Sequence, residues 1–567
     1  MDGLIIWIII RRLRLPILII IITFSIAILG MVLIPGMDNQ GRVYHLTIFD
    51  AFYFVSYMAS TIGFGESPYS FTYPQKLWVS FSIYISVIGW FYGIGAIISL
   101  VQDKILALEI ARARFIRSIN NFKEPFILVF GYNITTKKLI EKLNQEDRRM
   151  VVVDKDQNKI EALALENYNP YVPGFIADAL DAKILEIAGV KSPECQSVIV
   201  AFENDNKNAT IAMKCRYLNK NISFYIRSSY AKNSLYLQSL GFQHIENPFT
   251  VISKRFELAL RAPHVWLLES WIYGESLKNQ TKESIPAGEI IIYGYGRMGK
   301  ALEEGLKKTD RSYIFVDSQE IFDDDRVNHD VYVNEIIEQE LLNAGLKKAS
   351  VIIATSRDDM VNLSVIATAK KYNPKIYTIA RENDLKDLEM FHAVQVDRNY
   401  VLEYIITNKI YINIALPLAS IFLEHIYHKE DSWGKKLLER IFSKIGDSPD
   451  LYEVEISQRE TLALFNILKK KERIKLNILK RSRQNYKKSN ALLFLMIKRG
   501  DKNIILPNDN FEVKIGDKLL VACEEESKIE FMYILENFYD LFYVMHGYEK
   551  ISGILGFLNK KTRLASI

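Results

Sequence analysis

The sequence predicts a helical membrane part with two spans, followed by two doubly wound α/β units and a small C-terminal lobe. Three observations support this fold class. Two long apolar runs lie within the first 101 residues, the order strand, glycine turn, helix, strand and acid occurs twice after residue 124, and a short strand-rich segment follows near the end. A chain of 567 residues is too long for one core, so several domains are expected.

Composition excludes several classes of protein. The formal net charge of +5 is small for this length, so no nucleic-acid partner is expected. The three cysteines, Cys195, Cys215 and Cys523, form no C-x-x-C pair. They are therefore expected to be reduced thiols, and no zinc site is predicted.

The first apolar run, Leu15 to Pro35, matches the roughly 20 residues that cross a bilayer core. Arg11, Arg12 and Arg14 stand directly before it. A signal peptide also begins basic and turns apolar, but this run is too long for one and ends in no cleavage pattern. The shorter stretch Leu4 to Ile10 is expected to lie along the membrane interface.

The second apolar run, Leu77 to Val101, is also long enough to cross. Only Arg42 and Lys76 carry positive charge between the runs. Basic residues follow the second run at Lys104, Arg112, Arg114 and Arg117. By the positive-inside rule both termini are predicted to be cytoplasmic, in a multi-pass protein of the cell membrane, with everything after Gln102 inside.

Three glycines, Gly89, Gly93 and Gly95, interrupt the second run. Small residues allow close helix packing in membranes. They also allow a helix to bend, as a gate hinge requires. Both interpretations stay open at this point.

The segment between the spans carries a distinctive motif. Residues Thr47 to Ser60 form an apolar stretch too short to cross, followed by Thr61-Ile62-Gly63-Phe64-Gly65-Glu66. Alternating glycines permit backbone angles that point successive carbonyls towards one axis, where they replace the water around an ion. Irregular backbone at membrane depth is tolerated only where it lines such a cavity. The alternative, a chance glycine turn in an external loop, leaves this context unexplained.

This motif resembles the selectivity filter T-V-G-Y-G-D of potassium channels, with Ile62, Phe64 and Glu66 as departures. The resemblance implies K⁺ as the permeant ion and a homotetramer in the lipid membrane. The departures at Phe64 and Glu66 leave a less selective cation channel as an alternative.

The remainder of the chain contains an internal repeat. Glu124 to Val153 is followed by Asp154, and Gly288 to Val316 is followed by Asp317, in the same order of elements. Gly294 and Asp317 follow Gly131 and Asp154, respectively, by the same number of residues. Two copies of one Rossmann-like unit explain this pattern.

The second copy contains a complete G-x-G-x-x-G, in which the glycines serve the turn, the approach of a pyrophosphate and helix packing. Asp317 stands where a ribose-binding acid belongs, which favours NAD(H) or another adenine nucleotide. The predicted nucleotide-binding residues are Gly294, Tyr295, Gly296, Arg297, Met298, Gly299, Asp317 and Arg381. An enzyme that transfers hydride would also need an acid–base residue beside the cofactor, and no histidine pattern supplies one, so an oxidoreductase is the weaker alternative.

The first copy departs from this motif. Asn133 and Thr136 replace the second and third glycines, and their side chains crowd the path of a pyrophosphate. A weaker nucleotide site is therefore predicted at Gly131, Asn133 and Asp154.

Both copies resemble RCK domains, the regulators of K⁺ conductance, and the whole chain resembles two-transmembrane prokaryotic potassium channels with tandem RCK domains. The resemblance implies a ligand-gated channel rather than an enzyme, with a cytoplasmic gating ring and a C-terminal lobe around Ile504 to Cys523. The expected boundaries are 1–103 (pore domain), 104–123 (linker), 124–285 (first RCK domain), 286–430 (second Rossmann-like half) and 431–567 (C-terminal lobe and tail).

Other charged clusters gave weaker hypotheses. Calcium takes clustered carboxylates, which makes Asp178, Glu203 and Asp205 a possible Ca²⁺ site, although Lys207 nearby argues against it. The acidic run Asp323 to Asp325 is a second such cluster. Solvated acids are the simpler interpretation of both. A basic cluster is expected to be solvated, with lipid headgroups as the alternative, at Lys469, Lys470, Lys471, Arg473, Lys475, Lys480, Arg481 and Arg483.

Overall fold

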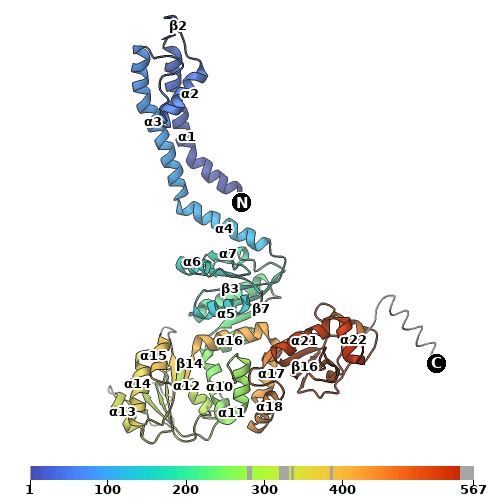
Figure 1. Cartoon of the computed structure of the whole chain (residues 1–567). Coiled ribbons are helices and arrows are strands. Elements are labelled where there is room, and N and C mark those ends of the chain that lie inside the picture. Colours follow the sequence, from blue (N-terminus) through green and yellow to red (C-terminus); the bar gives the residue numbers. More distant parts are fainter. Residues whose placement is uncertain (1, 278–283, 318–330, 334–336, 384–386, 550–567) are drawn as a thin grey trace, which may run out of the picture.

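The structure is a computed structural model that describes the chain except residues 1, 278–283, 318–330, 334–336, 384–386 and 550–567. The molecule is elongated, with the two long N-terminal helices at one end and the α/β units at the other (Figure 1). The acidic run Asp323 to Asp325 lies outside the described residues.

The membrane part consists of three helices: α1 (Asp2–Leu33), α2 (Ile48–Ala59) and α3 (Tyr73–Val101). The Ile9–Leu33 part of α1 and the whole of α3 are long and apolar enough to cross a membrane, as predicted. The two helices pack against each other, and the short α2 packs against both. Many large apolar side chains on α1 and α3 remain exposed, as lipid-facing helices require.

A further helix, α4 (Lys104–Asn120), connects α3 to the α/β units (Figure 1). Near its C-terminal end, Phe115 and Ile119 are buried in the core of the first unit. At its start, Asp103 forms an ion pair with Arg12 of α1. The helix α4 thus links the end of α3 to the core of the first unit.

Two six-stranded parallel sheets confirm the predicted repeat. The first has the order β5-β4-β3-β6-β7-β8, and the second has the equivalent order β11-β10-β9-β12-β13-β14. The strands of the first sheet are β3 (Phe126–Phe130), β4 (Arg149–Asp154), β5 (Gly174–Ile176), β6 (Cys195–Val200), β7 (Ser223–Arg227) and β8 (His244–Glu246). Those of the second are β9 (Ile290–Tyr293), β10 (Tyr313–Asp317), β11 (Val331–Val333), β12 (Val351–Ala354), β13 (Tyr377–Glu382) and β14 (Arg398–Val401).

The helices around these sheets follow the same repeat. In the first unit they are α5 (Ile134–Asn144), α6 (Gln157–Leu165), α7 (Ala182–Ile187), α8 (Asp205–Leu218) and α9 (Ala231–Ser239). In the second they are α12 (Arg297–Leu306), α13 (Ile337–Asn343), α14 (Asp359–Tyr372) and α15 (Leu388–Ala393). The central strands β3 and β9 are continuously apolar, as expected where helices cover both faces of a parallel sheet.

The two units exchange helices. The helix after the first sheet, α10 (Pro248–Arg261), packs against α12 of the second unit, and α16 (Leu402–Ala415) after the second sheet packs against α5 of the first (Figure 1). Together with α17 (Pro417–Tyr427), α16 forms a bent apolar pair whose length and composition alone would allow it to cross a membrane. Ile406 and Ile410 of α16 are instead buried in the core of the first unit.

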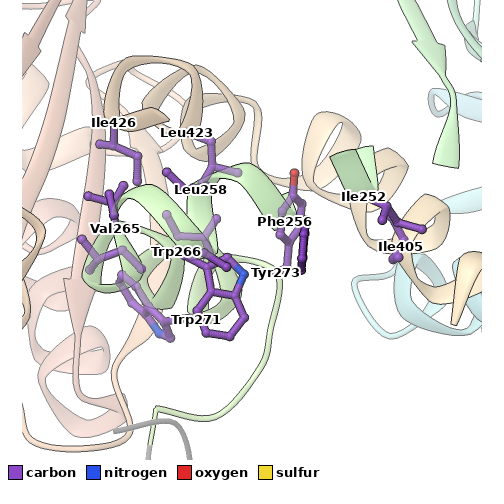
Figure 2. Close-up of a cluster of buried hydrophobic side chains, with 14 of the residues drawn as sticks. Ile252, Phe256, Leu258, Val265, Trp266, Trp271, Tyr273, Ile405, Leu423 and Ile426 are labelled. Carbon is purple, nitrogen blue, oxygen red and sulfur yellow. The ribbon is translucent and has the colours of Figure 1, made fainter. Parts of the chain in front are cut away.

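A shared apolar core joins these exchanged helices. Figure 2 shows Trp266 and Trp271 of α11 (Pro263–Ile272) beside Leu258 of α10 and Leu423 of α17. Trp266 is fully buried. The next helix, α18 (Asp431–Lys444), packs on α11 and completes this core.

The C-terminal lobe is a four-stranded antiparallel sheet with the order β15-β18-β16-β17 and its own core. Its elements are β15 (Asp450–Glu455), α19 (Leu462–Lys469), α20 (Leu476–Leu479), β16 (Leu492–Arg499), β17 (Lys502–Ile505), β18 (Lys518–Cys523), α21 (Glu525–Glu536) and α22 (Phe538–His546). The lobe predicted around Ile504 to Cys523 is therefore confirmed.

Candidate functional site

The loop after α2 has an alternating backbone. Thr61, Gly63 and Gly65 have φ values of 63°, 68° and 96°, whereas Ile62 and Phe64 between them are not left-handed. In an ordinary extended chain successive carbonyls point to opposite sides, and left-handed residues at every second position turn them to the same side. Two of these three positions are glycines, which adopt positive φ without a steric penalty.

Hydrogen bonds fix this loop against α2. The backbone N–H of Ile62 donates to the Tyr57 carbonyl at 3.0 Å, and the Tyr57 hydroxyl donates to the Gly65 carbonyl. Glu66 accepts from the Phe71 N–H at 2.8 Å and pairs with Lys76 at 3.3 Å. The loop is thus held at both ends, which a strained backbone segment requires.

One side of the loop is open. A Cβ added to Gly63 or to Gly65 would meet no other atom within 4 Å. Ile62 and Phe64 are 60% and 70% exposed in the single chain. Such a face can line an axis shared with further copies of the chain.

The glycines of α3 have different surroundings. A Cβ at Gly89 would lie 2.5 Å from the Thr23 hydroxyl, and one at Gly93 would lie 2.3 Å from Ile20, both on α1. Nothing lies within 4 Å of a Cβ at Gly95. Gly89 and Gly93 therefore serve close helix packing in this structure, and α3 runs unbroken past all three.

The glycine turn between β9 and α12 has the geometry that the G-x-G-x-x-G pattern predicts. Gly294 has φ 101°, and its N–H donates to Val316 at 2.8 Å. A Cβ at Gly299 would lie 2.1 Å from the Gly294 carbonyl, so only glycine fits there. The space beside Gly296, at the N-terminus of α12, is open. That is where a pyrophosphate would need to approach the backbone.

Asp317 ends β10 beside this turn. Its carboxylate accepts from the Tyr295 N–H at 2.7 Å, which orients it towards the turn. Glu340 of α13 is a second acid that the sequence did not reveal. The pKa of Glu340 is raised mainly by burial of its carboxyl group and also by the nearby charge of Asp317. The two acids are hydrogen-bond acceptors of the kind that ribose hydroxyls need.

Arginines gather at the same end of the second sheet. Arg297 begins α12, Arg357 follows β12 and Arg381 lies in β13. Arg381 is only 8% exposed, and burial together with the charges of Arg297 and Arg357 lowers its pKa to about 10. Within the described residues, the Nε atoms of Arg297 and Arg381 are buried without a hydrogen-bond partner. Mutually repelling, unsatisfied cations are the donors that a phosphate group would satisfy.

The first unit closes over this arginine cluster. The Arg297 guanidinium lies 4.9 Å from the ring centroids of both Tyr230 and Phe249, and Arg381 lies 5.9 Å from Phe249. Tyr230 precedes α9 and Phe249 belongs to α10, so both come from the first unit. Sequence reasoning found Arg297 and Arg381 but missed Arg357, Glu340, Tyr230 and Phe249, because no local motif marks these residues and only the tertiary fold brings them to one place.

The equivalent turn in the first unit is filled by its own side chains. Asn133 donates to the Ala201 carbonyl at 2.6 Å, and Thr136 donates to the Gly131 carbonyl at 2.9 Å. Asp154 still accepts from the Tyr132 N–H at 2.8 Å, as Asp317 does from Tyr295. The fold of the turn is retained, but side chains occupy the space that is open at Gly296.

The possible calcium site at Asp178, Glu203 and Asp205 is not supported. Both oxygens of Asp205 accept from the Ser229 N–H, at 2.9 and 2.8 Å, and one also accepts from Tyr230. Asp178 and Glu203 are exposed, and no group of three metal-ligating side chains occurs in the described part of the chain. The carboxylate of Asp205 instead fixes the loop after β7, so we do not propose calcium binding there.

Comparisons with known proteins agree with this repeat. The TrkA-N domain family matches residues 127–248 and 290–401, one match on each parallel sheet. The chain is 26% identical over 245 residues to potassium channel protein 1 of Methanocaldococcus jannaschii, a match to 42% of this chain and 64% of that one. It is 25% identical over 297 residues to an uncharacterized protein of Methanothermus fervidus, covering 52% of this chain and 45% of that one. The chain thus matches about half to two thirds of the length of these relatives.

Two solved structures are similar in fold. The GsuK channel bound to NAD has a TM-score of 0.45 and 18% identity, covering 93% of this chain and 98% of that one. GsuK bound to ADP has a TM-score of 0.43 and 20% identity, covering 74% and 99%. The chain thus carries two segments in tandem that match the TrkA-N domain family, behind two helices of membrane-spanning length, and part of it is similar to a potassium channel protein.

Proposed function

We propose that the chain is one subunit of a homotetrameric potassium channel in the cell membrane, and not an enzyme. The observation that carries this proposal is the alternating backbone of Thr61 to Gly65 between two spans. Four copies around one axis would present rings of carbonyl oxygens to a dehydrated K⁺ ion. Similarity to a potassium channel protein over part of the chain supports it.

We further propose that an adenine nucleotide such as NAD(H) binds the second TrkA-N domain. Gly294 to Gly299 would hold the pyrophosphate at the start of α12, Arg381 would neutralise it, and Asp317 would bind the ribose. The Asp317 carboxylate favours a ribose 2′-hydroxyl over a 2′-phosphate. The first domain would contribute Tyr230 and Phe249 but no second site of equal strength.

The fold offers a route from this site to the pore. Phe249 lies on α10 of the first domain and contacts Arg297 of the second, so a bound anion would change the contact between the domains. The first domain encloses the end of α4, which continues from α3. A nucleotide would shift the gate only by the difference between its affinities for the open and closed states. With both termini cytoplasmic, as the basic residues predict, this site faces the cytoplasm. If α3 bends to open and close the pore, Gly95 is the proposed hinge, because a Cβ there would meet no other atom within 4 Å.

The test is K⁺ flux from liposomes containing the purified full-length chain. Gly63→Ala is expected to abolish selective flux, because alanine resists the φ of 68° found there. Gly41→Ala is the matched control, since Gly41 also has positive φ (78°) and open surroundings but lies outside the motif. Normal K⁺ selectivity in Gly63→Ala would refute the filter assignment.

A less selective cation channel is the second candidate, favoured by the departures at Phe64 and Glu66. Glu66 is held by Lys76 and by the Phe71 N–H, so this acid fixes the outer end of the loop. Reversal potentials in mixed Na⁺ and K⁺ distinguish the two candidates. Equal permeability to both ions would establish the second.

A further inference from the structure

The two helix exchanges between the TrkA-N domains differ at one equivalent position. At the α10–α12 contact, a Cβ on Gly305 would lie 2.8 Å from the Ser253 carbonyl, so the two backbones touch. In the repeat, Lys142 of α5 occupies the position of Gly305, and Thr407 of α16 that of Ser253. The second contact therefore has a lysine side chain at the position where the first contact has a glycine.

A cavity of about 510 Å³ lies at this second contact. We call it the interdomain cavity. It is lined by α5 of the first domain, by β14 and α16 of the second, and by Arg255 of α10. Its volume is in the range of small-molecule sites, which is about 300–1,000 Å³. It lies at a different domain contact from the arginine cluster around Phe249.

The charged lining of the interdomain cavity favours an anion. The four cations are Lys138, Lys142, Arg255 and Arg398, and the two acids are Glu275 and Asp397. Both acids are already engaged: Glu275 pairs with both arginines, and Asp397 accepts from Thr378 at 2.6 and 2.8 Å. The Lys142 ammonium donates to the neutral Asn408 amide at 2.6 Å. Its charge is therefore not neutralised by that hydrogen bond.

Two polar atoms of the cavity lining also lack a partner. The hydroxyl of Tyr400, a residue only 3% exposed, has no hydrogen bond within the described residues. The Asn399 side-chain oxygen is likewise buried without a hydrogen-bond partner within the described residues. A buried polar group without a partner costs about 1–3 kcal/mol. Both oxygens have almost no accessible surface, so a ligand would reach them only after the surrounding side chains moved.

We propose that the interdomain cavity is a second ligand site, which binds a small organic phosphate monoester. Lys138 and Lys142 stand one helical turn apart on α5, so their ammonium groups can bind separate oxygens of one phosphate. Lys138 also pairs with Glu141 at 2.9 Å, and Arg255 with Glu269 at 3.5 Å. Lys142 forms no ion pair within the described residues, so it is the cation whose charge the phosphate would neutralise. The cavity volume of about 510 Å³ leaves room for an organic group beside the phosphate. Binding here does not depend on the proposed channel activity.

The test measures protection of Lys142 from chemical modification in the full-length protein. An amine-reactive reagent is applied at low stoichiometry, and labelling is mapped by peptide mass spectrometry. Burial lowers the pKa of Lys142, which favours labelling near neutral pH. Lys207 is the internal control, because burial lowers its pKa too and it lies outside the interdomain cavity.

The probes are ribose 5-phosphate, inorganic phosphate and unphosphorylated ribose. We expect ribose 5-phosphate to slow Lys142 labelling at least fivefold, with no protection by ribose and none of Lys207. Protection by inorganic phosphate alone would overturn the organic part of the proposal. Equal labelling with and without every probe would overturn it entirely.

Two variants separate this site from the nucleotide site. In Lys142→Gln, calorimetric affinity for ribose 5-phosphate should fall at least tenfold while affinity for NAD stays unchanged. In Arg381→Gln the reverse is expected. Loss of both affinities in Arg381→Gln would show that one shared site binds both ligands and would reject a separate interdomain site.

Discussion

The two TrkA-N domains have the same strand order but opposite suitability for a ligand. In the first, Asn133 and Thr136 use their side chains to close the glycine turn; in the second, Gly296 leaves it open and Gly299 allows the helix to touch the strand. At the positions equivalent to Arg297 and Arg357, the first domain has Ile134 and Glu203. The two copies share one fold, and these few side chains would decide which copy binds the proposed nucleotide.

The largest effect is expected from copying the first domain's threonine into the second. Gly299→Thr would place a Cβ 2.1 Å from the Gly294 carbonyl, and the turn would have to deform. We expect affinity for NAD to fall at least about a hundredfold, since overpacking typically costs about 1–3 kcal/mol and the site geometry is lost as well. Isothermal calorimetry on the full-length protein checks this. The reciprocal Thr136→Gly should leave NAD affinity unchanged; a loss there would place the ligand in the first domain.

The next effect concerns the buried arginines. Arg381→Gln should weaken NAD binding about thirtyfold, because a charge-assisted hydrogen bond contributes about 1.5–3 kcal/mol. The same change should raise the melting temperature of the ligand-free protein, since it relieves repulsion with Arg297 and Arg357. Thermal denaturation with and without NAD measures both effects. Arg149→Gln, which removes an arginine of the first domain that pairs with Glu124 and lies outside the cluster, is the control and should not affect affinity.

A third prediction compares how two equivalent helices are capped. At the start of α11, the backbone N–H of His264 donates to the Asp431 carboxylate at 2.7 Å. At the start of α17, the backbone N–H of Ala419 donates to the Glu453 carboxylate at 2.7 Å. Burial raises the pKa of Glu453 to about 7, against an ordinary value of 4.5. The folded state therefore binds this proton more tightly than the unfolded state does, so stability falls as pH rises from about 4.5 to above 7.

Glu453→Gln removes that titration and keeps an acceptor for the Ala419 N–H. We expect the variant to gain about 2 kcal/mol over the native chain at pH 8 and little or nothing at pH 4.5. Denaturant unfolding at the two pH values measures the difference. A gain that is equal at both pH values would mean that Glu453 does not titrate in this range.

The smallest effect is expected at the acid that ends β10. Asp317→Ala should weaken NAD binding about tenfold, through loss of a hydrogen bond to the ribose and of the contact with the Tyr295 N–H. Asp317→Asn keeps an acceptor and should lose less affinity. Unchanged affinity in Asp317→Ala would move the ribose elsewhere.

Local patterns predicted most of the fold. The apolar lengths of the two spans, the repeat of strand, glycine turn and acid, and the apolar strand before Cys523 all depend on neighbours in the sequence. They were confirmed in the structure for that reason. The glycines of α3 could not be interpreted from the sequence, because a hinge and close helix packing both require small residues. The contacts of Gly89 with Thr23 and of Gly93 with Ile20, both on α1, show packing in the structure.

By itself the sequence determined the element types, the duplication and the two glycine motifs, because backbone freedom and apolar periodicity are properties of short segments. The tertiary structure decided which side chains share a site. The exchange of α10 and α16 brings Phe249 to Arg297 and places Lys142 beside Asn408, pairs far apart in the chain. Contacts across domains depend on how helices pack, so no local pattern in the sequence records them.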